Sequence, residues 1–141
     1  DTADFFWVTD HGTRGRIDMV VYSFPYVSGR TFTLDYLVAM RDSVLGEHIQ
    51  GAFPGSYMTT EKRFTPSYEA ISKNGEYCGV VRGLWEMEGD MMGGPFVSHA
   101  LLDKKKGRVI VAESFVYAPE SKKANLIRRM EAALFTLRFV D

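Results

Sequence analysis

Residues 76–117 read EYCGVVRGLWEMEGDMMGGPFVSHALLDKKKGRVIVAESFVY, and this stretch decides the fold. Segments rich in β-branched and aromatic residues alternate in it with segments rich in turn formers: strands are expected at 76–88, 96–103 and 108–117, and turns at 89–95 and 104–107. Asn74-Gly75, directly before the stretch, is the dipeptide most typical of a two-residue hairpin. The stretch therefore predicts an antiparallel meander of three strands.

Both faces of this meander are apolar. In residues 76–88 the side chains of Tyr77, Val81 and Trp85 share one face, and those of Cys78 and Val80 share the other, because side chains alternate along a strand. A sheet with one face in water should alternate between apolar and polar residues. We therefore expect both faces to be covered. The aromatic face needs its own cover, which is the N-terminal segments, another domain or a partner chain.

The rest of the chain supplies further strands and two helices. An N-terminal hairpin is expected from 5–9 and 17–24, and shorter strands at 56–64 and 67–72. Thr33 is a suitable N-cap for a first helix, whose apolar face is formed by Leu34, Leu37, Val38, Val44, Leu45 and Ile49, with Arg41, Asp42 and Glu47 toward the other side. Pro119 suits the start of a second amphipathic helix over 120–138. The predicted fold class is α+β: an antiparallel β-sheet, with a C-terminal three-stranded meander plus an N-terminal hairpin, packed by two amphipathic helices.

Composition limits the class of protein. A chain of 141 residues corresponds to one domain, so we expect residues 1–141 to form a single α+β unit. The formal net charge of −1 gives no positive field to gather phosphates, which argues against a nucleic-acid partner. No run of apolar residues approaches the roughly 18 that a membrane-spanning helix needs.

Motifs for metal binding or nucleophilic catalysis are not found. The three histidines, His11, His48 and His99, are far apart in the sequence and belong to no zinc-binding pattern. Cys78 is the single cysteine and has no sequence neighbour that would activate it. We therefore expect no metal and no cofactor, and no catalytic residue is assigned.

Glu113 is the one charged residue whose position in a strand requires an explanation. It stands among apolar neighbours, where a carboxylate must find a partner or shift its pKa. A buried ion pair with Arg82 or Arg108 is one interpretation. A catalytic acid is the other. Separately, a hydrolase would require a closed pocket in which a Ser or Glu meets a His or Arg.

Two sets of side chains are candidates for contact with a ligand or partner. Met91 and Met92 stand in the glycine-rich turn 89–95, and adaptable methionine side chains often mark contact surfaces. Tyr57, Tyr77 and Trp85 are aromatic residues that would offer stacking surfaces to a carbohydrate or another small ligand. Binding or assembly without catalysis is the leading functional prediction, with the carbohydrate or small-ligand module and the hydrolase as alternatives.

Several short blocks resemble a family of uncharacterised Bacteroidetes lipoproteins, a domain of unknown function: Phe6-Trp7, residues 32–36, 55–61, 81–85, 92–96 and 115–119. The resemblance implies a signal sequence, a lipid-attachment cysteine and a further region upstream of Asp1. It implies an extracytoplasmic location, in the periplasm or at the outer membrane, with the membrane reached only through a lipid anchor outside this chain. The expected partner is the upstream region or another envelope protein. The resemblance implies no activity.

Overall fold

The computed structural model describes residues 5–12, 15–117 and 134 of the chain. The elements are β1 (Phe5–Gly12), β2 (Gly15–Pro25), the 3-10 helix η1 (Gly29–Phe32), α1 (Leu34–His48), β3 (Tyr57–Thr60), β4 (Ser67–Lys73), β5 (Glu76–Glu88), β6 (Gly93–Asp103) and β7 (Arg108–Val116). The predicted N-terminal hairpin and C-terminal meander are both present, as β1–β2 and β5–β6–β7.

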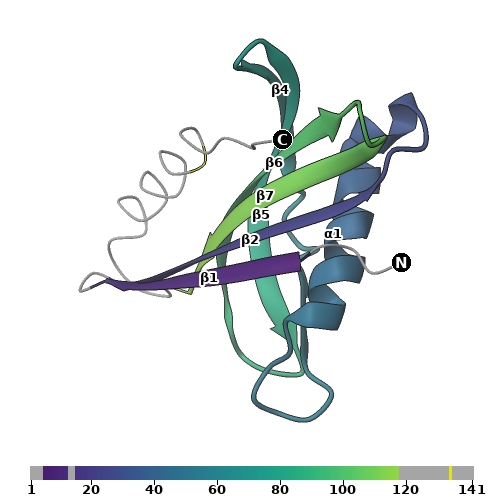
Figure 1. Cartoon of the computed structure of the whole chain (residues 1–141). Helices are drawn as coiled ribbons and strands as arrows, with labels where there is room; N and C mark the ends of the chain where they lie inside the picture. Colours follow the sequence, from purple (N-terminus) through teal and green to yellow (C-terminus); the bar gives the residue numbers. More distant parts are fainter. Residues whose placement is uncertain (1–4, 13–14, 118–133, 135–141) are drawn as a thin grey trace.

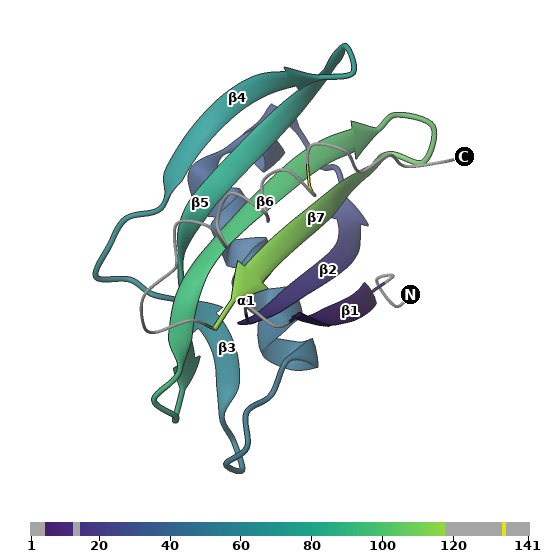
Figure 2. The ribbon, with the colours of Figure 1, turned by 90° about the vertical axis from the view of Figure 1, so that its left-hand side faces the viewer.

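All strands join one antiparallel sheet in the order β1-β2-β7-β6-β5-β3. β4 also pairs with β5, so β3 and β4 lie one after the other along the same edge of that strand. Long strands twist, and the accumulated twist curls the sheet into a half-barrel whose hollow side holds α1 (Figures 1 and 2).

The prediction of a sheet packed by two amphipathic helices is wrong. One helix, α1, lies against the hollow side of the sheet, and a curled sheet needs no more than one helix to fill that side. The predicted second helix, residues 120–138, lies outside the described residues except for Leu134, which is helical and buried. The domain is therefore a half-barrel around a helix, and not a flat sheet under a helical layer.

The aromatic face of β5 is the hollow face, and α1 covers it. The core on this side joins apolar side chains of the sheet to those of the helix: Val20, Tyr22, Phe24, Val81, Trp85, Phe96, Val111 and Phe115 from strands, and Leu37, Val44 and Leu45 from α1. The cover that the sequence required is thus an element of the same domain. Neither another domain nor a partner chain is needed on this face.

The outer face is buried at its centre as well. Cys78, Val80, Val97, Ala112 and Val116 form a second apolar cluster there, together with Leu134. The alternation in β5 therefore predicted the two faces correctly.

Helix α1 begins as the sequence indicated but buries one unexpected residue. The Thr33 hydroxyl accepts a hydrogen bond from the Tyr36 amide at 3.3 Å, which confirms Thr33 as the N-cap. Arg41 was expected on the solvent side, and instead it is buried on the face that packs into the hollow. Its spacing from Leu37 and Val44 places it within the apolar stripe despite its charge.

Candidate functional site

Trp85, predicted to be a stacking surface, is a core residue. Its indole Nε1 donates a hydrogen bond to the carbonyl oxygen of Val116 at 3.0 Å, and its ring meets Phe115 edge to face with centroids 5.6 Å apart. The side chain is buried, so its ring is not available to a ligand in this structure.

Tyr77 and Tyr57 are exposed but lie at opposite ends of the molecule. Tyr77 is near the start of β5, and Tyr57 pairs with Glu88 at the end of the same strand. Eleven residue steps separate Tyr77 from Glu88, which corresponds to about 36 Å at the usual rise of a strand. The structure therefore does not bring Tyr57, Tyr77 and Trp85 together into one surface.

Tyr57 and Met91 do lie at the same end, and Phe53 joins them. The loop between α1 and β3 carries Phe53, the start of β3 carries Tyr57, and the β5–β6 turn carries Met91; both connections lie at the lower end of the molecule in Figure 1. Met91 is 96% exposed and Phe53 60% exposed, while Tyr57 is also an exposed large apolar residue. We call Phe53, Tyr57 and Met91 the tip. Met92, by contrast, is half-buried against the core.

Phe53 was missed by the sequence analysis. The signal was present, because an aromatic residue followed by Pro54 in a loop has no strand or helix in which to be buried. That Phe53 and Met91 would lie at the same end of the molecule could not be foreseen, since they are 38 positions apart and their connections share that end only through the pairing of β3 with β5.

Hydrogen bonds hold both connections of the tip in place. In the loop, the Ser56 hydroxyl and the Ser56 amide both donate to the carbonyl oxygen of Phe53, at 2.7 and 3.1 Å, and the Gly51 amide donates to Ser56 at 3.1 Å. In the turn, the Met91 amide donates to the Asp90 carboxylate at 2.7 Å. The exposed rings and thioether are therefore presented by ordered backbone, which lowers the entropy lost on binding.

The charge around the tip is negative. Glu88 stands opposite Tyr57 in the sheet, and Asp90 directly precedes Met91. Residues 49–60 and 86–96 contain no lysine or arginine. The tip is an apolar surface with an acidic rim.

Glu113 is the centre of a buried polar network. Arg41 Nε and one terminal nitrogen donate to the two carboxylate oxygens of Glu113, each at 2.8 Å. The other terminal nitrogen donates to the Thr60 hydroxyl at 3.0 Å, and the guanidinium lies 3.9 Å from the centre of the Phe96 ring. The interpretation as a buried ion pair is confirmed, but the partner comes from α1 and is neither Arg82 nor Arg108.

This network has the properties of a structural element. Arg41 and Glu113 are buried between helix and sheet, where a substrate could not reach them. Burial raises the pKa of Glu113, and the Arg41 charge and hydrogen bonds oppose that rise. Burial and the negative charge of Glu113 also raise the pKa of Tyr22. Arg82 pairs with Glu69 at 2.8 Å, and Arg108 donates to the Ser23 hydroxyl at 3.2 Å.

Cys78 is not placed to act as a nucleophile. Burial raises the pKa of its thiol to about 11, so the thiol is protonated at neutral pH. Within the described ranges, no three His, Cys, Asp or Glu side chains are grouped so as to hold a metal ion.

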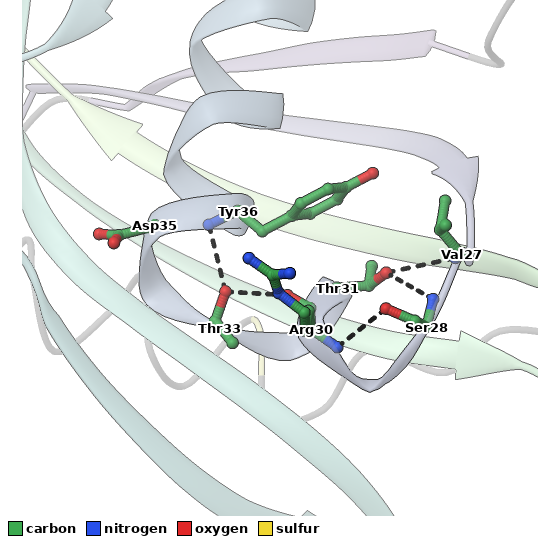
Figure 3. A pocket seen from close by; sticks show the side chains of 7 residues that line it. All are labelled: Val27, Ser28, Arg30, Thr31, Thr33, Asp35 and Tyr36. Atoms are coloured by element: carbon green, nitrogen blue, oxygen red, sulfur yellow. Dashed lines mark hydrogen bonds between the residues drawn. The ribbon is translucent and has the colours of Figure 1, made fainter.

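A surface hollow of about 590 Å³ opens beside η1 and the start of α1 (Figure 3). It is lined by Val27, Ser28, Arg30, Thr31, Thr33, Asp35 and Tyr36. The three serine and threonine hydroxyls in the lining accept hydrogen bonds from backbone amides of the same segment: Ser28 from Arg30, Thr31 from Val27 and Ser28, and Thr33 from Tyr36. These groups shape the turn into α1, and that role explains their presence without a ligand.

An aromatic series lies near this hollow. Tyr26 and Phe32 have ring centroids 6.2 Å apart, and Phe32 meets the Tyr77 ring edge to face at 5.4 Å. The Tyr77 and Tyr68 hydroxyls are 2.6 Å apart. This end of the molecule, opposite the tip, is where Tyr77 is exposed.

No helix among the described residues has the length and apolar character to cross a membrane.

Fold and surface together define an antiparallel half-barrel around one helix, with an apolar tip at one end and an aromatic series at the other. The sequence model of a family described as Domain of unknown function (DUF4837) matches residues 1–136, and the chain belongs to this family. The resemblance to a domain of unknown function is thereby confirmed. No curated protein matches the chain.

Proposed function

We propose that this domain binds a protein partner through the tip and works by assembly, without catalysing a reaction. The observation that carries the proposal is the tip itself: Phe53, Tyr57 and Met91 are exposed on hydrogen-bonded connections that both lie at one end of the sheet. Aromatic and methionine side chains are enriched in protein interfaces, and large exposed apolar residues that cluster mark contact sites.

The chemistry of the tip specifies the partner. An apolar centre with Glu88 and Asp90 at its rim fits a protein surface that has an apolar pocket and a basic rim, because complementary charges steer association. The same carboxylates would be repelled by an anionic lipid surface. The tip therefore favours a protein over a bilayer.

The proposed location is the cell envelope of a Bacteroidetes species, with attachment through a lipid outside this chain. The sequence blocks that resemble such lipoproteins support this part, for example Phe6-Trp7 and residues 81–85. The upstream region of the same protein or another envelope protein would then be the partner at the tip.

Site-specific photocrosslinking in the cells that produce the protein tests the proposal. A photoreactive amino acid replaces Met91 in one variant and the exposed Lys104, in the β6–β7 turn, in a control variant. A discrete crosslinked protein from position 91 is expected, and it should disappear when Phe53→Ser and Tyr57→Ser are added. Equal crosslinking from both positions, or none from position 91, would contradict the proposal.

A small ligand, such as a carbohydrate, at the opposite end is a second candidate. The series Tyr26–Phe32–Tyr77 favours it, because aromatic rings beside a surface hollow suit a sugar. A glycan array followed by thermal-shift titration checks it. The expected signal is a rise in Tm that Tyr77→Ala abolishes and Tyr57→Ala retains; no binding to any glycan would remove this candidate.

A further inference from the structure

The first strand of the sheet is an open edge. β1 stands at one end of the strand order and pairs with β2 alone among the described strands, along its whole length from Phe5 to Gly12. It lies at the border of the sheet in Figures 1 and 2. An edge strand presents a row of backbone donors and acceptors, and the group that satisfies such a row is another extended strand.

β1 also exposes apolar side chains on both of its faces. Phe6 and Val8 are each 66% exposed, and they stand opposite Val21 and Met19 on the outer face of the sheet. Trp7 points to the other face, where its indole donates to the Asp18 carboxylate at 3.1 Å and its ring is still exposed. The edge therefore combines open backbone with exposed large side chains.

The first five residues of this strand lack the devices that normally protect an edge. Residues 5–9, Phe-Phe-Trp-Val-Thr, include no charge, proline or glycine. The opposite edge of the sheet is protected, because β3 has four residues and β4 carries the exposed, ion-paired Glu69. The difference between the two edges indicates that β1 is used for pairing.

We propose that β1 pairs antiparallel with the β1 of a second copy of this chain about a two-fold axis at Trp7, so that one sheet runs through a homodimer. The strand is complementary to itself in this arrangement: Phe6 and Val8 of both copies gather on the same face, and the uncharged stretch 5–9 brings no like charges together. This proposal goes beyond the function of the tip and does not depend on it.

The arrangement closes at two copies. A two-fold pairing uses the β1 edge of each copy, and the remaining edge is short at β3 and charged at β4. The paired stretch 5–9 forms a small interface, so a dissociation constant in the micromolar range is expected.

Sedimentation velocity of the full chain over a micromolar concentration series tests the proposal. The chain should dimerise, and Val8→Lys should make it monomeric because a charged ammonium would replace the apolar contact with Phe6 of the second copy. Val27→Lys is the matched control, since Val27 is an apolar residue that is 71% exposed elsewhere on the surface; this variant should still dimerise. Met91→Asp, at the tip, should also still dimerise.

A chemical crosslink locates the interface. With Val8→Cys, a short bis-maleimide should link two copies, whereas Val27→Cys should give no linked pair. The native Cys78 is buried and does not compete. A monomer at every concentration, a dimer that survives Val8→Lys, or equal linking from positions 8 and 27 would each overturn the proposal.

Discussion

At the scale of single residues, the domain is organised by the buried ion pair between Arg41 and Glu113. Arg41 leaves α1 toward the sheet and forms two hydrogen bonds with Glu113 and one with Thr60. A buried ion pair of this kind is costly to break by removing one partner, because the other charge is left without compensation. Replacing both residues of the pair with apolar side chains costs much less free energy of unfolding.

Variants of this pair should show that asymmetry. Arg41→Met alone is expected to destabilise the protein by about 3–5 kcal/mol, because it leaves Glu113 as an isolated buried carboxylate. Adding Glu113→Leu should recover most of that loss. Urea denaturation of the two single variants and the double variant measures it. Equal destabilisation in the single and double variants would show that the ion pair is not the cause.

Glu61 should make stability depend on pH in the acid range. Its carboxylate accepts hydrogen bonds from the amide and the guanidinium of Arg63, and these lower its pKa from 4.5 to about 2. A pKa that is lower in the folded state contributes stability above the unfolded value, and this contribution is lost as the pH falls toward 2. Glu61→Gln should therefore lower the urea midpoint at pH 6 and flatten its fall between pH 4.5 and about 2.

Removing the charge of Glu86 should change stability in the opposite direction, so Glu86→Gln serves as a control. Burial and the negative charge of Glu61 raise the pKa of Glu86, so its ionised form disfavours folding at neutral pH. Glu86→Gln should raise the urea midpoint at pH 6. A fall in both variants would mean that packing, and not charge, dominates at this site.

At the scale of elements, the half-barrel depends on close approach between neighbouring strands. β6 begins with Gly93-Gly94, and Gly94 stands opposite Trp85 in β5. The carbonyl oxygen of Val116 in β7 lies against Gly94 and accepts the indole hydrogen bond of Trp85. A side chain at position 94 would occupy that place and separate the strands.

Gly94→Ala should therefore destabilise the protein by about 1–3 kcal/mol, the usual effect of inserting a methyl group where there is no room. Gly29→Ala is the matched control, because a methyl group at position 29 meets nothing within 4 Å. Thermal denaturation of both variants, with the Trp fluorescence spectrum, checks the result. Comparable Tm values for the two variants would contradict the crowding at Gly94.

At the scale of the whole molecule, residues far apart in sequence cover the outer face. Leu134 is fully buried in the cluster that contains Cys78 and Val80. The backbone carbonyl of Leu134 accepts a hydrogen bond from the buried Lys73 ammonium at 2.7 Å. The end of β4 and this late part of the chain are thereby joined.

The reactivity of the Cys78 thiol measures how well Leu134 covers the outer face. Leu134→Ala should cost about 2–4 kcal/mol, the usual cost of truncating a buried leucine. It should also speed the alkylation of Cys78, because the thiol becomes reactive only when the cluster opens. Alkylation rates under native conditions measure the effect, with Val27→Ala as a control at an exposed position. An unchanged rate in Leu134→Ala would show that Leu134 does not protect the thiol.

Local patterns were sufficient for much of the fold. Alternation in residues 76–88 predicted both buried faces, and Asn74-Gly75 predicted the hairpin, whose two turn residues have φ values of 54° and 81°. Thr33 was predicted as the N-cap because capping depends on neighbours within three residues. These features are decided by interactions close in sequence.

Contacts between residues far apart in the sequence were decided only by the tertiary structure. The sequence by itself determined that the strands of residues 76–117 are apolar on both faces, that a helix follows Thr33 and that the Glu113 carboxylate needs a partner. Only the curl of the sheet decided that α1 alone fills the hollow and that Arg41 is the partner of Glu113. It also decided that Trp85 is buried while Tyr57 and Met91 are exposed at one end. Twist accumulates over many strands and brings together residues such as Arg41 and Glu113, which are 72 positions apart. A local sequence pattern therefore cannot predict which of these distant residues will be in contact.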